Sequence, residues 1–227
     1  MKTKFFNLII LDESGSMSCV AQQTISGCNE TIQTIQSAQQ TFADTQEHII
    51  SIYCFQDGGR PSRYLVKNQP ALSVHMISDK DYEPWGGTPL NDAVGATLTD
   101  LKFHAQKEPQ AVGSVTIITD GMENASREFS HAQVKRMIEQ LKELGWNFNF
   151  IGANIDAQST AHSYAIDNHL QFQQDEEGTR RMFACTNASR SAYYERVEQE
   201  MSECAPCAAP EERAERLSRA GKGFFKK

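Results

Sequence analysis

The chain has 227 residues, enough for one sizeable hydrophobic core and a C-terminal segment but hardly for two full domains. Its formal net charge of -7 argues against nonspecific binding to nucleic acid or to anionic membranes. A membrane-spanning helix needs about 20 apolar residues in a row, and no apolar stretch is that long. From the charge and the absence of such a stretch we expect neither a nucleic-acid nor a membrane partner.

The N-terminus carries Lys2 and Lys4 before an apolar run over residues 5–11, an arrangement similar to a short signal peptide. The run is at the short limit for such a segment, Asp12 and Glu13 follow it at once, and no small-residue cleavage site appears. We therefore expect a cytoplasmic protein.

The first predicted strand is the apolar run over residues 7–11, which ends in Asp12. Unbroken apolar runs are typical of strands buried on both faces of a parallel sheet, and ligands bind at the carboxyl ends of such strands. Ser14 and Ser16 add two oxygens on the same loop, and Gly15 lets the backbone bend between them. Hard oxygen donors suit Mg²⁺, although an ordinary Asp/Ser/Gly turn explains the same residues equally well.

Helical and strand patterns alternate along the next part of the chain. Apolar residues at helical spacing predict a helix over residues 22–42, and an apolar run predicts a strand over 49–55. Two shorter runs, 63–67 and 71–76, are separated by Asn68-Gln69-Pro70 and predict a hairpin or an edge strand.

A second helix is expected after the sequence Gly-Gly-Thr-Pro-Leu, with Thr88 as its N-cap and Pro89 as its first residue. The next strand, over 114–119, also ends in an acid, Asp120. Further along we predict helices over 131–144 and 157–164 and strands over 147–151 and 170–172.

This alternation predicts an α/β fold: a doubly wound, Rossmann-like, mainly parallel sheet with one short antiparallel edge strand and helices on both faces. We assign residues 1–175 to this domain and 176–203 to a C-terminal helical extension. Residues 204–227 become polar and poor in apolar side chains, so we expect a flexible tail there.

The six cysteines give weaker signals. Cys54 lies in an apolar run and is expected in the core, whereas Cys19 and Cys28 flank the first loop and could pair. Cys204 and Cys207 form a CxxC motif without a second pair or nearby histidines, which is a weak indication of a zinc site.

Five oxygen-bearing side chains are predicted to meet at one edge of the sheet. Asp12, Ser14 and Ser16 follow one strand, Asp120 follows another, and Thr88 precedes the helix that leads into this second strand. In a right-handed parallel sheet these loops lie on the same edge. Each residue alone has an ordinary explanation as a turn or helix cap, but their joint placement favours a shared cation site.

Asp12-x-Ser14-x-Ser16, Thr88 in Gly-Gly-Thr-Pro-Leu and Asp120 in Thr-Asp-Gly together resemble the metal-ion-dependent adhesion site of von Willebrand factor A domains. The resemblance implies that Ser14, Ser16 and Thr88 ligate Mg²⁺, or Mn²⁺, directly. It implies that Asp12 and Asp120 act mostly through bound waters, and that an Asp or Glu carboxylate of a protein partner completes the coordination. Neutral hydroxyls next to the ion leave it electrophilic toward such a carboxylate.

The surface around this site is expected to select the partner. Trp85 would be either a hot spot for that partner or an anchor that folds its own loop. The expected rim consists of Glu13, Met17, Trp85, Met122, Glu123 and Asn124.

The main enzymatic alternative is a Mg²⁺-dependent phosphohydrolase of the haloacid dehalogenase type, which also places an acid after its first strand. That chemistry needs a nucleophilic Asp and usually a second Asp two positions later, where this chain has Ser14. A serine hydrolase is disfavoured because no Gly-x-Ser-x-Gly elbow is present. A metal-free structural or interaction module is a further alternative.

We therefore predict a non-enzymatic, divalent-metal-dependent protein-binding module. Its length and lack of an evident secretion signal are more similar to bacterial A-domain proteins of intracellular complexes than to adhesins, which is an argument by analogy.

Overall fold

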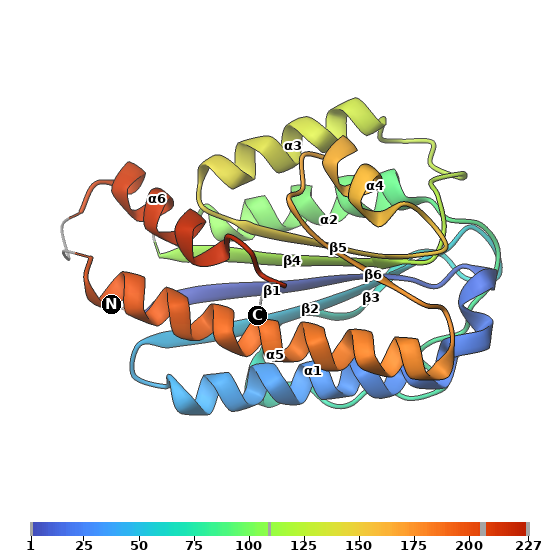
Figure 1. Ribbon diagram of the computed structural model, residues 1–227, viewed down its shortest axis with the longest axis horizontal. Coiled ribbons are helices and arrows are strands. Elements are labelled where there is room, and N and C mark those ends of the chain that lie inside the picture. The colour runs from blue at the N-terminus through green and yellow to red at the C-terminus, as the bar shows by residue number, and fades with distance from the viewer. Residues whose placement is uncertain (1, 109, 205–207, 226–227) are drawn as a thin grey trace.

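The computed structural model describes residues 2–108, 110–204 and 208–225 and is built around one six-stranded sheet, with strand order β3-β2-β1-β4-β5-β6 (Figure 1). All neighbouring strands are parallel except β2 and β3. The fold class predicted from the sequence is therefore confirmed, including its antiparallel edge. The strands are β1 (Thr3–Asp12), β2 (Gln46–Phe55), β3 (Arg63–Pro70), β4 (Ala111–Thr119), β5 (Asn147–Ala153) and β6 (Asn168–Phe172).

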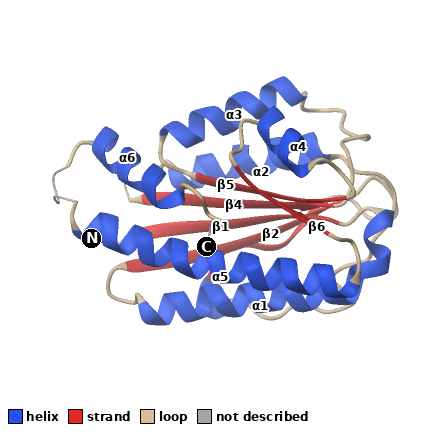
Figure 2. Cartoon of the chain, viewed as in Figure 1, coloured by secondary structure: helices blue, strands red, loops and turns tan. Residues whose placement is uncertain are grey.

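The helices form a layer on each side of the sheet (Figure 2). One layer consists of α1 (Ala21–Thr41) and α5 (Glu176–Ser202), which lie side by side, and the other of α2 (Leu90–Ala105), α3 (His131–Glu143) and α4 (Ala157–Ser163). Because β1 is covered on both faces, nearly all of its side chains are buried, as its apolar sequence predicts. Two apolar clusters result, one on each side of the sheet.

Two local predictions need correction. The run over 71–76 forms no strand: Ala71–Ser73 make one 3-10 turn, and Ala71 and Val74 pack against the core. Their carbonyl groups both accept hydrogen bonds from the Gln36 amide of α1, so the backbone polar groups that a strand would pair are satisfied by a side chain. Helix α2 begins at Leu90 after an N-cap at Pro89, which makes no side-chain capping hydrogen bond, so Thr88 is not the N-cap.

The C-terminal part is more ordered than the sequence suggests. Residues 210–221 form helix α6 (Pro210–Gly221), so the expected flexible tail is wrong for this stretch. The helix buries Leu217 and Ala220 against α5 and the start of β5, and Phe224 beyond it is 1% exposed. Three apolar residues in a polar stretch are too few to predict a docked helix from the sequence, but all three are buried in the same core cluster.

The C-terminal segment is also tied to the start of β6. The side-chain amide of Asn168 donates to the carbonyl of Gly221 (3.0 Å), and its side-chain oxygen accepts from the backbone N–H of Phe224 (3.1 Å). The Asn168 side chain thus satisfies backbone groups of this segment that would otherwise need a backbone partner.

The described cysteines include Cys19, Cys28 and Cys54, all as free thiols, and Cys54 is buried as predicted. The possible pair of Cys19 and Cys28 is not formed. Cys207, the second residue of the CxxC motif, lies outside the described residues. Within the described part of the chain, no helix has both the length and the apolar composition to cross a bilayer.

Candidate metal centre

The loops at the carboxyl ends of β1 and β4 are joined through the carboxylate of Asp12. Asp12 is fully buried as the last residue of β1, and its Oδ1 accepts a hydrogen bond from the backbone N–H of Ser14 (2.7 Å). Its Oδ2 accepts from the hydroxyl of Thr119 at the end of β4 (2.6 Å). The bond to Ser14 is an Asx turn, in which an Asp side chain accepts the backbone N–H two residues further along the chain. The bond from Thr119 fixes this loop to the neighbouring strand β4.

The two serines of the first loop connect to the second acid. The hydroxyl of Ser16 donates to Oδ1 of Asp120 (2.8 Å), and the hydroxyls of Ser14 and Ser16 are 3.2 Å apart. Four of the five predicted residues, from loops more than a hundred positions apart, therefore form one hydrogen-bonded set, in which the backbone N–H of Ser14 makes the link to Asp12. The adjacency of β1 and β4 in the sheet is what brings them together.

Thr88 approaches the same place from the loop before α2. It is buried, and its hydroxyl lies so close to Gly121 that a Cβ on that glycine would be 3.2 Å from Oγ1. Its backbone is held on both sides by Asn124: Oδ1 of Asn124 accepts from the Thr88 N–H (2.8 Å), and the Asn124 N–H donates to the Thr88 carbonyl (3.2 Å). Asn124, predicted as a rim residue, thus positions Thr88.

This donor set is chemically suited to a hard divalent cation. The residues in question supply only oxygens, two carboxylates and three hydroxyls, which Mg²⁺ and Mn²⁺ accept together with waters. Across residues 2–108, 110–204 and 208–225, no group of three or more His, Cys, Asp or Glu side chains could hold a metal ion. A site built from three or more such side chains is therefore not found in these ranges.

Burial raises the pKa of Asp12 to about 6, and the hydrogen bonds from Thr119 and Ser14 oppose this rise. The nearby carboxylate of Asp120 contributes a further increase of the same pKa. A bound cation would favour the ionised form of both carboxylates.

Sequence reasoning missed Gln174, which follows β6. Its side-chain amide donates to Oδ2 of Asp120 and to the backbone carbonyl of Ser16 (2.8 Å), and its own oxygen accepts from the amide of Asn154, which follows β5. Both residues stand just beyond the carboxyl end of a parallel strand. Asn154 and Gln174 therefore follow the same rule as Asp12 and Asp120, since side chains just after parallel strands lie at the ligand-binding edge. Their amide groups in polar loops did not distinguish them from ordinary loop residues in the sequence.

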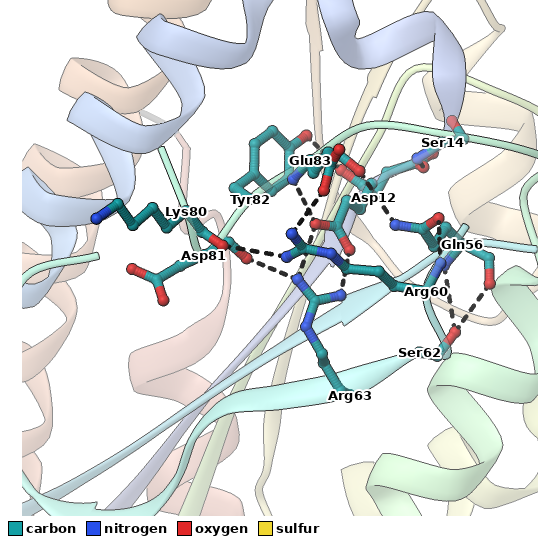
Figure 3. Close-up of polar contacts among 11 residues, drawn as sticks. Asp12, Ser14, Gln56, Arg60, Ser62, Arg63, Lys80, Asp81, Tyr82 and Glu83 are labelled. Carbon is teal, nitrogen blue, oxygen red and sulfur yellow. Dashed lines mark hydrogen bonds and ion pairs between the residues drawn. The ribbon is translucent and has the colours of Figure 1, made fainter. Parts of the chain in front are cut away.

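Two expected rim residues lie in the interior, so their assignment to the rim is wrong. Met17 is 1% exposed and belongs to the core beside α1. Glu13 is 0% exposed, and its carboxylate is held by the guanidinium of Arg63 from β3. Figure 3 shows Arg63 and Tyr82 gathered next to Asp12, and the hydroxyl of Tyr82 donates to the Asp12 carbonyl (2.6 Å).

The remaining rim residues differ in exposure. Met122 and Trp85 are 72% and 64% exposed, although the Trp85 ring also covers Gly58, where a Cβ would be 2.3 Å from the ring. Glu123 is partly buried, and its carboxylate accepts backbone N–H groups of its own loop and of Asn91 at the start of α2 (2.7 Å). Glu123 therefore has a structural role as a cap.

Searches by sequence find no matching family model and no matching curated protein. Solved structures with similar folds include the von Willebrand factor type A protein from Catenulispora acidiphila, at 14% identity and a TM-score of 0.57, which covers 84% of this chain and 43% of that one. The pilus adhesin SpaC from Lactobacillus rhamnosus GG has 11% identity and a TM-score of 0.60, covering 86% of this chain and 31% of that one. The manganese-loaded TRAP protein of Plasmodium vivax has 16% identity and a TM-score of 0.51, covering 79% and 72%.

These similarities establish a von Willebrand factor A-type fold and, at such identities, the fold alone. This chain spans less than half of the Catenulispora protein.

Proposed function

We propose that this chain is a protein-binding module that holds Mg²⁺, or Mn²⁺, at the loops after β1 and β4 and uses it to bind an Asp or Glu carboxylate of a partner. The observation that carries the proposal is the chain of contacts from Asp12 through Ser14 and Ser16 to Asp120, with the hydroxyl of Thr88 beside it. The von Willebrand factor A-type fold supports an interaction module in general.

In this proposal, Ser14, Ser16 and Thr88 would hold the ion directly, and Asp12 and Asp120 would orient its waters and balance its charge. The bound ion would supply Lewis acidity toward an incoming carboxylate. The exposed side chains of Trp85 and Met122 would contact the partner around it, because both offer large apolar surface beside the site.

The metal is tested by titrating Mg²⁺ into metal-free protein while following thermal unfolding and binding heat. We expect Mg²⁺ to raise the Tm of the wild type, and EDTA to reverse the increase. Thr88→Ala should lose the response. The control Thr34→Ala removes a hydroxyl that bonds to the Glu30 carbonyl of its own helix and to no other described residue, so this variant should keep the Mg²⁺ response. An equal Mg²⁺ response in Thr88→Ala would overturn the assignment.

The partner is tested by affinity capture in Mg²⁺ and in EDTA, using the wild type and Thr88→Ala. A partner that satisfies the proposal binds only the wild type in Mg²⁺, and replacing one of its acidic residues by the amide abolishes binding. A partner that binds equally in EDTA would contradict it.

We further propose that the module is not an enzyme and that it works inside the cell. The five cysteines in the described part of the chain are all free thiols, which supports a reducing compartment. An assay of p-nitrophenyl phosphate turnover distinguishes the binding module from the phosphohydrolase alternative. Turnover that is lost in Asp12→Asn would favour the enzyme, whereas a Tm response to Mg²⁺ without turnover favours the binding module.

A further inference from the structure

Arg190 in the middle of α5 is a fully buried cation that has no acidic partner among the described residues. Its side chain is 0% exposed, and one guanidinium nitrogen, Nη2, donates to the hydroxyl of Thr116 on β4 (2.9 Å). The other two, Nε and Nη1, have no hydrogen-bond partner among the described residues. An arginine keeps its proton in the interior of a protein, so this positive charge is permanent.

The polar residues around Arg190 also have unused hydrogen-bonding groups. Ser114 stands two positions before Thr116 and on the same face of β4, and Asn149 of β5 is directly opposite Thr116. Tyr193 lies one helical turn after Arg190 on α5. The hydroxyls of Ser114 and Tyr193 and both atoms of the Asn149 amide are buried without a partner in the described structure.

The surroundings of this cluster are buried and mostly apolar, although Tyr194 contacts the Arg190 side chain and donates to Asn7. Burial and the Arg190 charge together lower the pKa of His48. Phe5 packs edge-on against the ring of Tyr193, and Val112, Ile118 and Ile151 are buried in the same cluster on this side of the sheet. In such surroundings a buried charge interacts strongly with an opposite charge because little water screens it. Buried water could satisfy the free hydrogen-bonding groups, whereas an anion would also balance the guanidinium charge that the Thr116 hydroxyl can only partly offset.

We propose that a small monovalent anion, with chloride as the physiological candidate, binds between the sheet and α5 in contact with Arg190. The guanidinium would supply the charge and two N–H donors. The hydroxyls of Ser114 and Tyr193 and the amide N–H of Asn149 would supply further donors. This site is separate from the proposed metal centre and does not depend on it.

The test compares the thermal stability of the EDTA-treated wild type in sodium chloride and in sodium gluconate at the same ionic strength. We expect the Tm to rise with chloride concentration and to saturate, whereas the larger gluconate ion gives no such increase. Arg190→Met should lose the chloride response, and Arg136→Met, which removes an exposed arginine, should retain it. Equal Tm values in the two salts, or the same chloride response in Arg190→Met, would overturn the proposal.

A second measurement applies if Arg190→Met does not fold. Crystals of the wild type grown in sodium bromide should show an anomalous peak beside the Arg190 guanidinium, and Ser114→Ala and Asn149→Ala should each weaken the apparent halide affinity at least about threefold. Electron density for water alone at this position, with no anomalous signal, would refute the anion site.

Discussion

The guanidinium of Arg63 holds the carboxylate of Glu13 in two hydrogen bonds, of 2.6 and 3.0 Å, although Glu13 is completely buried. The same carboxylate accepts the backbone N–H of Glu83 (2.6 Å). Because Glu13 stands between Asp12 and Ser14, this pair fixes the loop of the candidate metal centre to the antiparallel edge strand. Strand β3 thus helps to position the loop that carries Asp12 and Ser14 without contributing a residue to the candidate metal centre.

Replacing Arg63 by Met should destabilise the protein by about 3 kcal/mol, because it leaves the Glu13 charge buried without its partner. The estimate is at the low end of the range for buried pairs, since the Arg63 side chain is 24% exposed. Urea denaturation measures the loss. The double variant Glu13→Gln/Arg63→Met should recover part of it, and a double variant no more stable than Arg63→Met would show that charge is not the cause.

Replacing Gln174 by Met should weaken Mg²⁺ binding by about tenfold, a typical effect of losing a group that orients a metal-binding carboxylate. The reason is the amide hydrogen bond to Asp120. Titration calorimetry measures the affinity, and the exposed neighbour Gln171→Met is a control with no such contact among the described residues. Tighter binding in Gln174→Met would mean that the amide competes with the ion instead of orienting its ligand.

The buried imidazole of His48 should make folding sensitive to acid. Burial lowers the pKa of His48 to about 3 from its ordinary value of 6.5, and the charge of Arg190 adds to this effect. The unfolded chain therefore binds a proton below pH 6.5 that the folded chain does not bind until about pH 3. This contribution to stability is complete above pH 6.5 and is lost as the pH falls from 6.5 toward 3, by up to about 1.4 kcal/mol per pH unit.

The measurement is the free energy of unfolding between pH 4 and pH 8. His48→Phe keeps the stacking on Phe5, where the ring centroids are 4.8 Å apart, and should flatten the profile in this range. His75→Gln removes an exposed histidine and serves as the control. A profile for His48→Phe as steep as that of the wild type would contradict the assignment.

Replacing Phe224 by Ala should destabilise the protein by about 3–4 kcal/mol, the usual loss for a buried phenylalanine. Phe224 is 1% exposed and its ring lies 5.9 Å from that of Tyr193 on α5. The matched control is Phe103→Ala on α2, because Phe103 is 58% exposed and should change the stability little. Equal small effects in chemical denaturation would indicate that the C-terminal segment does not stay docked in solution.

The crossing of α1 and α5 predicts a strong effect at Gly27. A Cβ at this position would lie 2.1 Å from the ring of Phe183, so Gly27→Ala must push the two helices apart. We expect a loss of about 1–3 kcal/mol from overpacking, despite the better helix propensity of alanine. Thermal unfolding measures it, and Gly27→Ala/Phe183→Leu should restore part of the stability. No loss in Gly27→Ala would show that the helices can move apart freely.

The sequence was sufficient to predict the centre of the sheet because the four central strands, β1, β2, β4 and β5, are buried on both faces. Such strands need continuous apolar runs, as in residues 7–11, and the acids that follow them mark the carboxyl edge of the sheet. This rule placed Asp12 and Asp120 on neighbouring loops, and their contacts with Ser14 and Ser16 follow from it.

What could not be predicted depends on partners from distant elements. Glu13 is expected on the surface unless the register of β3 is known, since Arg63 is what allows its burial. Helix α6 is amphipathic but polar in total, and its docking depends on a surface formed by α5 and β5. Arg190 belongs to the same class, because nothing in the sequence marks one arginine of a charged helix as buried.

The hydrogen bonds from Asn168 to Gly221 and Phe224 have a consequence for the behaviour of the protein at high concentration. They hold the last described residues against β6, the outermost strand on that side, whose free backbone groups could otherwise pair with another molecule. We therefore expect a chain shortened before α6 to leave the start of β6 more exposed and to aggregate more readily than the full chain.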